Sequence, residues 1–397
     1  MALREPYRRD GWLDDEALIA RILQHLDRGT TDISQETWRE PVEHYRSSAR
    51  FEAEVRLLRH HAVPFCPSAA LPESGSYVAR VAAGVPIVVV RGRDGDTRAF
   101  RNVCRHRGAV VAGGSGCAKS LSCPYHGWTY RLDGTLQHVP DEYGFPGLVK
   151  EDRGLVPVSV SERGGLVFVE QDGDGSSSRS RAPDERWVDP RPVLLGSNEF
   201  TVHANWKVLT EGFLEGYHLR ATHRTTFLPF GYDNVTVVEY CGPDSRVTFP
   251  FRRIEALRDA PRGQRNLDGT VTMVHHIFPN VIIARLSHHT TMVVLEPEAV
   301  DRTRFVTYQL VSGGTELLNG ARNNNDDKAA ARRDVEFVQL GAAEDNAVAL
   351  AVQRGLASGA NEFLEFGRFE GALTHFHKEL RALIDGADES TPSRLGS

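Results

Sequence analysis

The sequence predicts an α+β fold, in which a β-rich region precedes a region that mixes helices with strands. Residues 14–27 have amphipathic spacing with acids in the first turn, which predicts a short helix, and residues 32–37 predict the start of another. From about Tyr77, runs of β-branched residues bounded by turn residues predict strands and hairpins. The expected strands and hairpins lie at 85–91, 97–100, 129–136, 281–284 and 291–295, and a closing helix is expected at 362–385.

Length and composition predict that the chain has more than one domain. Its 397 residues exceed what a single core usually holds. The Gly- and Ser-rich stretch 172–181 has no large apolar side chains to bury and therefore predicts a linker. The expected parts are a helical arm at 1–50, a first domain at 51–172, a flexible linker at 173–187, a second domain at 188–390 and a tail at 391–397.

Overall composition is that of a water-soluble protein, with 40% hydrophobic and 25% charged residues. The net charge of −6 gives no indication of a nucleic-acid or membrane surface. No apolar run reaches transmembrane length, and residues 1–22 lack the apolar core of a signal peptide. Five cysteines do not form a disulfide framework, so we expect a cytoplasmic protein.

The most informative motif is C-x-H-x16-C-x2-H, formed by Cys104, His106, Cys123 and His126. Each of its two loops supplies one thiolate and one imidazole. A Rieske [2Fe-2S] cluster needs that donor set, because two Cys bind one iron and two His bind the other. A glycine follows each histidine, where the chain must turn and direct backbone N–H groups toward the sulfurs. A structural zinc site is the alternative, although zinc modules usually pair Cys with Cys and His with His.

A second set of ligand-type residues follows residue 204. Asn205 is a plausible N-cap of a helix in which Glu215 lies three residues before His218, on the same face. His223 lies five residues after His218, about 140° around an ideal helix. If both histidines bind one metal, the helix must end or distort between them, which Gly216 makes easier.

Both regions resemble the oxygenase (α) subunits of Rieske non-haem iron ring-hydroxylating oxygenases. Residues 51–172 resemble the Rieske domain, and Asn-Trp-Lys followed by Glu-x3-Glu-x2-His-x4-His resembles the mononuclear-iron segment. The resemblance implies an all-β Rieske domain followed by a catalytic domain with a helix-covered antiparallel sheet. Respiratory Rieske proteins add a disulfide between their ligand loops, but this chain has Ala109 and Tyr125 there.

The resemblance implies that His218 and His223 bind Fe(II) with a later carboxylate, as a 2-His-1-carboxylate triad. Asp345 is the expected third ligand, because the family uses the second acid of a Glu-Asp pair; Glu344 is the rival. Val338, Val348 and Val352 share the helical face of Asp345, which predicts apolar surroundings for its carboxylate.

Further roles follow from the same resemblance. Glu215 is expected to bridge His126 of one chain to His218 of the next, as an inter-subunit route for electrons; many members have Asp there. Gly212 stands where well-studied members have Asn, so the substrate contacts assigned to Gly212 and Phe213 depart from the family pattern.

The implied function is that of a terminal oxygenase that uses O₂ to hydroxylate a small organic substrate, expected to be aromatic. The alternative is a Rieske monooxygenase or an N- or O-demethylase acting on a non-aromatic, for example quaternary ammonium, compound. A pure electron-transfer protein is a third hypothesis. Because the glycine run 113–116 lies between the two cluster loops and not at a strand-to-helix turn, no dinucleotide site is expected. Electrons are expected from a separate NAD(P)H reductase, directly or through a ferredoxin, and the resemblance implies an α3 ring with or without a β subunit.

Overall fold

The computed structural model describes residues 12–173, 187–188, 192–286, 289–312 and 324–389. For residues 324–332 and 387–389 it describes the backbone alone. The expected linker and tail lie largely or wholly outside these residues. The described residues form two units: Leu58–Leu194, and a discontinuous unit made from Met1–Leu57 together with Leu195–Ser397. An all-β first unit and a helix-covered antiparallel sheet in the second confirm the predicted fold class.

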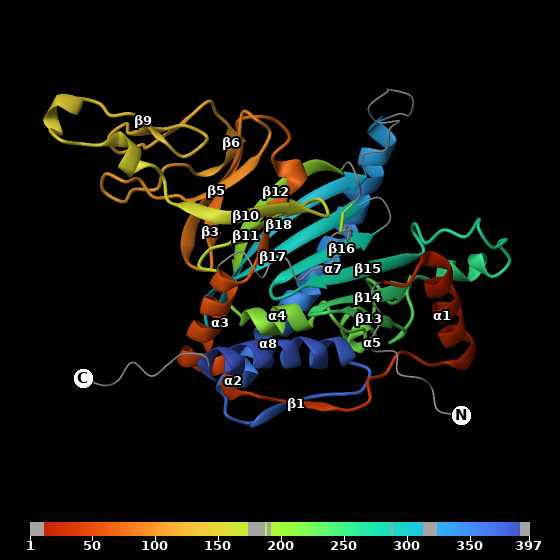
Figure 1. The fold of residues 1–397 in the computed structure, drawn as a ribbon. Coiled ribbons are helices and arrows are strands. Elements are labelled where there is room, and N and C mark those ends of the chain that lie inside the picture. The colour runs from red at the N-terminus through yellow and green to blue at the C-terminus, as the bar shows by residue number, and fades with distance from the viewer. Residues whose placement is uncertain (1–11, 174–186, 189–191, 287–288, 313–323, 390–397) are drawn as a thin grey trace. The chain divides into compact units, whose positions relative to one another are not determined.

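The Leu58–Leu194 unit contains two antiparallel sheets in its described part (Figure 1). Strand β4 (Val85–Arg91) coincides with the predicted strand, and β5 (Thr97–Arg101) returns beside it. The larger sheet has the order β2 (Val63–Pro67), β11 (Leu166–Glu170), β10 (Pro157–Arg163), β5, β4, β3 (Ser76–Ala82) and β6 (Gly114–Cys117). The smaller sheet contains β7 (Leu121–Ser122), β8 (Thr129–Tyr130) and β9 (Leu136–His138).

The discontinuous unit is built on one antiparallel sheet, which has seven strands in its described part. Their order is β12 (Pro192–Val202), β18 (Arg302–Ser312), β17 (His289–Ala299), β16 (Val281–Leu286), β15 (Val271–Ile277), β14 (Asp244–Pro250) and β13 (Val237–Cys241). Its helices are α1 (Asp15–Arg28), α2 (Glu43–Arg46), α4 (Trp206–Glu211), α5 (Leu219–Thr222), α7 (Asn324–Ala357) and α8 (Gly371–Glu389). Helix α3 (Ser48–His60) crosses the division between the units.

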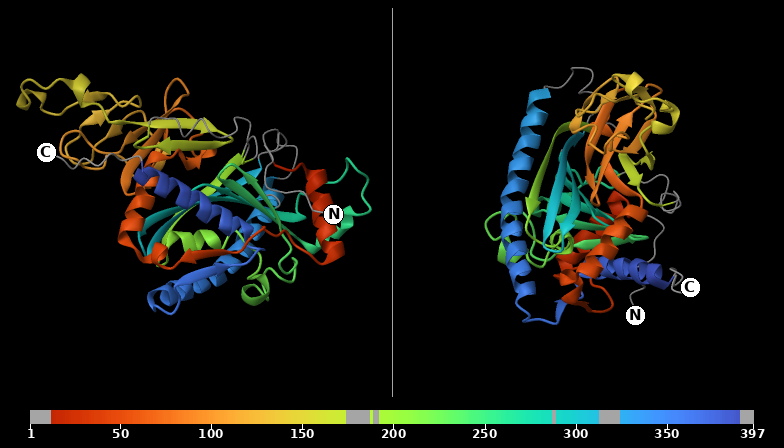
Figure 2. Two further views of the ribbon diagram at one scale, coloured as in Figure 1. Left: turned by 60° about the horizontal axis from the view of Figure 1, so that its bottom comes forward. Right: turned by 90° about the vertical axis from the view of Figure 1, so that its left-hand side faces the viewer.

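Three helices share one large hydrophobic core with this sheet. Helix α7 runs along the sheet and contacts β17 (Figure 2, right). Helix α4 contacts both α7 and β17. Trp206 of α4 packs edge-on against Phe376 of α8, with ring centroids 5.6 Å apart. This core fixes α7, the helix that carries Asp345.

The N-terminal helix confirms its prediction. Asp14 caps α1 by accepting a hydrogen bond from the Ala17 N–H, and Gly29 ends the helix at φ 59°, a conformation that favours glycine. Its apolar side chains form a second core with β13 and β15. The helix therefore packs within the discontinuous unit.

The prediction that a helix starts at residues 32–37 is wrong. The buried Asp32 carboxylate accepts a hydrogen bond from the Val238 N–H and pairs with Arg21 and His25. These tertiary contacts hold the segment extended, so Asp32 anchors the chain to β13 instead of capping a helix.

The closing helix starts later than predicted. Residues Phe363–Phe366 form strand β19, which pairs antiparallel with β1 (Trp38–Pro41). Helix α8 begins at Gly371, after a turn in which the Glu370 carboxylate accepts a hydrogen bond from the Gly367 N–H. Pairing with a strand more than 300 residues away overrides the local helical pattern.

Candidate metal centres

The two cluster loops have the same backbone turn. In each loop the cysteine N–H donates to the carbonyl five residues later, at 2.8 Å, from Cys104 to Ala109 and from Cys123 to Trp128. In each loop a glycine N–H donates back to the cysteine carbonyl, at 3.0 Å. These glycines, Gly108 and Gly127, have φ of 77° and 72°, so a side chain there would strain the turn.

The four candidate cluster ligands lie together. Both cysteines are buried, and the rings of His106 and His126 have centroids 4.7 Å apart. Burial raises the pKa of the Cys123 thiol, the neighbouring Cys104 adds to the rise, and the N–H groups of Tyr125 and His126 oppose it. Backbone donors therefore point at this sulfur, as an anionic cluster requires. Paired thiols beside paired imidazoles fit a [2Fe-2S] cluster.

Aromatic side chains that the sequence analysis did not single out surround these ligands. His106 stacks on Trp128 at 5.0 Å and meets the edge of Phe145. The Tyr130 hydroxyl accepts a hydrogen bond from the Arg105 N–H at 2.9 Å, so its own proton points to Cys104 Sγ, 3.2 Å away. In the sequence, only the position of Tyr130 could have indicated this contact, because Tyr130 lies on β8, directly after the second cluster loop. All five cysteines are free, which agrees with the expected absence of a loop disulfide.

The second candidate site lies where helix α4 has already ended. Asn205 caps α4, as predicted, by accepting from the Lys207 N–H. Helix α4 ends at Glu211, and His218 and His223 flank the four-residue helix α5. The first break therefore precedes His218, and α5 ends at Thr222, so a helix also ends between the two histidines, as expected if both bind one metal.

Three side chains converge there, from the two ends of α5 and from α7. The Nε2 atoms of His218 and His223 are 3.2 Å apart. Asp345 Oδ1 lies 2.9 Å from the His223 Nε2 and 3.6 Å from the His218 Nε2. All three ligand atoms lie within 4.8 Å of one another, a spacing that one metal ion would fit. Burial lowers the pKa of His223, but Asp345 and then Glu344 raise it, with a net rise; the site therefore favours positive charge.

Each histidine has a carboxylate behind it. Glu215 hydrogen-bonds the His218 Nδ1 and also accepts the backbone N–H of His218. Glu344 Oε2 lies 2.8 Å from the His223 Nδ1 and accepts the Thr226 hydroxyl at 2.6 Å. Carboxylates at Nδ1 hold the tautomer whose Nε2 lone pairs face the convergence point. Glu344 thus contacts the outer face of His223, whereas the Asp345 carboxylate lies where the two Nε2 atoms converge.

The expectation of apolar surroundings for Asp345 needs correction, whereas the substrate contacts of Gly212 and Phe213 stay a prediction. The Asp345 side chain is 39% exposed and Val348 45% exposed, so the face predicted as apolar is open in the described structure. Phe213 packs against the large core, and an added Cβ at Gly212 would meet only the Leu209 carbonyl, at 3.8 Å. In the described part of the chain, no ring contact joins Phe213 to either histidine.

An aromatic wall that the sequence analysis missed lies beside His223. The Phe227 ring is 4.6 Å from the His223 ring and 5.0 Å from Phe337, which in turn meets the edge of Phe230. A Cβ at Gly341 of α7 would lie 2.0 Å from the Phe227 ring, so glycine is required for this close approach. Three phenylalanines spaced along two segments gave no periodic signal in the sequence.

Comparisons with known proteins define the class. The family model of the ring hydroxylating alpha subunit (catalytic domain) matches residues 183–386, and that of the Rieske [2Fe-2S] domain matches residues 61–150. The chain belongs to the ring-hydroxylating alpha-subunit family. The expected cofactors, a [2Fe-2S] cluster and mononuclear iron, agree with these two domains.

Individual relatives fall into two substrate groups. The carnitine monooxygenase oxygenase subunit of Acinetobacter pittii is 34% identical over 212 residues, which are 51% of this chain and 56% of that protein. The chloroplastic choline monooxygenase of Beta vulgaris is 27% identical over 325 residues, 77% of this chain and 68% of that protein. Naphthalene 1,2-dioxygenase from Rhodococcus sp. shares the fold, with a TM-score of 0.71 at 19% identity, over 96% of this chain and 100% of that chain. The chain therefore spans little more than half the length of the carnitine enzyme that it matches.

Proposed function

We propose that this chain is the terminal oxygenase component of a Rieske oxygenase system, which uses O₂ and external electrons to hydroxylate a small organic substrate. The observation that carries this proposal is the convergence of His218, His223 and Asp345. A pure electron carrier has no need of a second site with two histidines and a carboxylate. In this chain, the carboxylates of Glu215 and Glu344 hold the two imidazoles with their Nε2 atoms directed toward the convergence point.

The proposed ligand roles follow the geometry. Cysteines 104 and 123 with histidines 106 and 126 hold the [2Fe-2S] cluster, and His218, His223 and Asp345 hold Fe(II). When bound, the cluster supplies single electrons and the mononuclear iron supplies open positions for O₂ beside the substrate. Glu215 fixes His218 from behind. We extend the proposal to Glu215 as the link that brings electrons from His126 of a neighbouring copy, within an α3 ring.

For the substrate, we favour a quaternary ammonium compound, which is oxidised by monooxygenation. The sequence resemblance to carnitine and choline monooxygenases supports this choice over the aromatic substrate first expected. The phenylalanine wall beside His223 is compatible with it, because aromatic faces attract quaternary ammonium groups. Cis-dihydroxylation of an aromatic ring remains the second candidate, because the same faces pack against an aromatic ring and the fold matches naphthalene 1,2-dioxygenase.

Partners and location complete the proposal. Electrons come from a separate NAD(P)H reductase, directly or through a ferredoxin. We place the enzyme in the cytoplasm, on the grounds that none of its five cysteines is paired in a disulfide. None of the described helices is long and apolar enough to cross a membrane.

Chemically reduced enzyme tests this function without the unidentified reductase. Reduced protein is mixed with ¹⁸O₂ and carnitine, choline, naphthalene or biphenyl, and products are analysed by mass spectrometry. One ¹⁸O atom in a product from carnitine or choline supports the proposal, whereas a cis-diol with two ¹⁸O atoms transfers support to the aromatic candidate. Iron analysis giving about two atoms per chain, instead of about three, would contradict any oxygenase role.

The Glu215 link has its own test. Glu215→Gln keeps a side-chain oxygen near His218 but removes the charge, so at saturating Fe(II) both metal sites should be loaded while reoxidation of the reduced cluster slows. Stopped-flow absorbance of the Rieske cluster measures that step. Wild-type reoxidation rates in the variant would exclude the link.

A further inference from the structure

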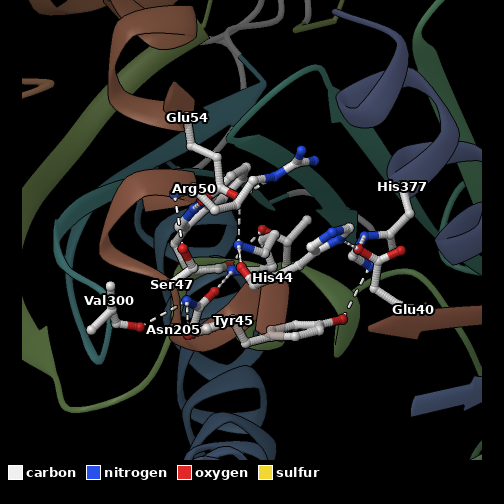
Figure 3. Close-up of polar contacts among 12 residues, drawn as sticks. Glu40, His44, Tyr45, Ser47, Arg50, Glu54, Asn205, Val300 and His377 are labelled. Atoms are coloured by element: carbon white, nitrogen blue, oxygen red, sulfur yellow. Dashed lines mark hydrogen bonds and ion pairs between the residues drawn. The ribbon is translucent and has the colours of Figure 1, made fainter. Parts of the chain in front are cut away.

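Two acids and two imidazoles of the discontinuous unit form a chain of polar contacts. Figure 3 shows three of its members, Glu40, His44 and His377. Glu40 of β1 and Glu211 of α4 lie on opposite sides of His377 of α8. The His377 Nε2 is 2.9 Å from Glu211 Oε1, and its Nδ1 is 3.6 Å from Glu40 Oε1. His44 of α2 continues the chain, with Nδ1 2.5 Å from the same Glu40 oxygen.

The chain is closed to water at one end and open at the other. The side chains of His377 and Glu40 are 1% and 3% exposed, whereas that of His44 is 24% exposed. Phe366 stacks on the His377 ring and Phe376 packs against it, so apolar walls surround the imidazole. Protons can therefore enter this chain at His44.

A fixed negative charge lies between the two imidazoles of the chain. Burial would raise the pKa of Glu40, but His44, His377 and Trp38 lower it to about 2, so Glu40 is ionised at neutral pH. The ion pairs made by Glu40 and Glu211 in the described structure are all with imidazoles. A fixed Lys or Arg would hold a carboxylate permanently neutralised, but an imidazole can take up and release its proton near neutral pH.

The neighbouring pair is arranged differently. Lys207 Nζ lies 2.6 Å from Glu54 Oε1, both are fully buried, and Arg50 lies 3.4 Å from the same carboxylate. Fixed cations thus neutralise Glu54, which leaves the exchangeable protons to the imidazole chain. Burial, with Glu211 nearby, raises the pKa of Tyr45 well above its usual value. Tyr45 therefore stays protonated and donates to Glu211 Oε1 at 2.6 Å.

The inner end of the chain lies at the start of the segment that carries the candidate iron ligands. Glu211 is the last residue of α4, four residues before Glu215 and seven before His218. Burial raises the pKa of Glu370 to about 7; the Gly367 N–H opposes the rise, and the charges of Glu215 and Glu211 add to it. One carboxyl thus feels both the end of the chain and the residues at the iron site.

We propose that His44, Glu40, His377 and Glu211 form a proton relay that carries protons from solvent toward the oxygen-reducing site. This inference rests on the proposed oxygenase function. Hydroxylation consumes protons: R–H + O₂ + 2e⁻ + 2H⁺ gives R–OH + H₂O, with the O–O and C–H bonds broken and C–O and O–H bonds formed. The external donor supplies two electrons and the C–H bond supplies two. His377 accepts a proton at Nδ1 from the Glu40 side and releases one from Nε2 to Glu211.

Coupling between the imidazoles tests the relay without turnover. Histidine-labelled protein, without added substrate or reductant, is titrated by NMR, and His377 is assigned with His377→Gln. In a relay, His44→Gln raises the pKa of His377 by about one unit, because Glu40 no longer shares its charge with His44. Glu211→Gln lowers the same pKa, because a facing carboxylate is lost. If neither substitution moves the titration of His377, the relay is overturned.

Turnover supplies the second test. His377→Gln keeps the side-chain size and hydrogen bonding but cannot carry a proton, so kcat should fall about 100-fold with KM unchanged. The solvent deuterium isotope effect on kcat should rise, while iron content and the Rieske spectrum stay as in wild type. A merely structural role would instead lower iron content or stability and leave the isotope effect unchanged, which would overturn the relay.

His276→Gln is the matched control. His276 is also fully buried in the same core, 5.2 Å from the Phe376 ring, but hydrogen-bonds the Pro279 carbonyl. It should retain kcat and the wild-type isotope effect; equal losses in both variants would overturn the assignment to His377. Absence of product from the wild type would defeat the proposed function, while the NMR coupling would still decide whether the four groups form one titrating chain.

Discussion

Glu344 and Asp345 are adjacent acids with different predicted costs of removal. Glu344→Gln keeps an oxygen that can accept from the His223 Nδ1, 2.8 Å away, but loses the negative charge. The Thr226 hydroxyl and then His223 hold the pKa of Glu344 below its usual range, so that charge is present at neutral pH. Loss of a carboxylate behind a metal-binding histidine typically costs 10- to 100-fold in metal affinity, about 1.4–2.8 kcal/mol. We expect Fe(II) affinity to fall within that range.

Asp345→Ala should do more, because Oδ1 lies at the point where both Nε2 atoms converge. That variant should lose mononuclear iron on desalting and keep the Rieske spectrum. Competition with a chelator measures the affinity of each variant, and Glu336→Gln, an exposed acid on the same helix, is the control. If Glu344→Gln lost iron outright while Asp345→Ala retained it, the two roles would be reversed and the geometric argument refuted.

Three further predictions concern the surroundings of the two sites. Lys207→Met should destabilise the protein by about 3–5 kcal/mol in urea unfolding, because it leaves Glu54 buried without its nearest cation. Tyr130→Phe should lower the reduction potential of the cluster in a spectroelectrochemical titration, because a hydrogen bond to Cys104 Sγ favours the more negative, reduced form. Ionised Glu40 should stabilise the fold above about pH 4.5 and progressively less as the pH falls toward about 2, because its folded pKa is the lower one. The urea midpoint against pH should therefore fall less steeply in Glu40→Gln.

Each of these has a decisive contrary result. The double variant Lys207→Met, Glu54→Gln should recover part of the lost stability, and no recovery would mean that packing, not charge, causes the loss. An unchanged or higher potential in Tyr130→Phe would show that the hydroxyl does not stabilise the reduced cluster by donating to the sulfur. If the urea midpoint fell equally steeply at low pH in the wild type and in Glu40→Gln, a group other than Glu40 would cause the acid sensitivity.

The sequence predicted best where local chemistry decides the structure. The run of β-branched residues at 85–91 gives a strand assignment that the structure matches to the residue in β4. Asn205 caps α4 because a short side-chain acceptor at that position suffices to satisfy a free backbone N–H. The spacing of ligand-type residues likewise reports on chemistry that needs little tertiary context.

Prediction failed where distant segments compete with local preference. Asp32 looks like a helix cap, but a strand 200 residues later offers its buried N–H instead. Residues 363–366 read as helix until their strand partner at 38–41 is known. The second carboxylate behind the iron site, Glu344, was visible only as a rival ligand, because the direction of a side chain on α7 depends on how that helix docks.

The discontinuous unit also has a consequence for synthesis. Helix α1 and strand β1 leave the ribosome well before their partners β13 and β19, which lie more than 200 and 300 residues later. Residues 58–194 can complete their sheets meanwhile, because their strands pair within that stretch. The apolar face of α1, with Leu18, Ile19 and Ile22, stays uncovered until the second sheet is made. Both elements must therefore wait for segments that are synthesised much later, and their apolar side chains need protection from aggregation in the meantime.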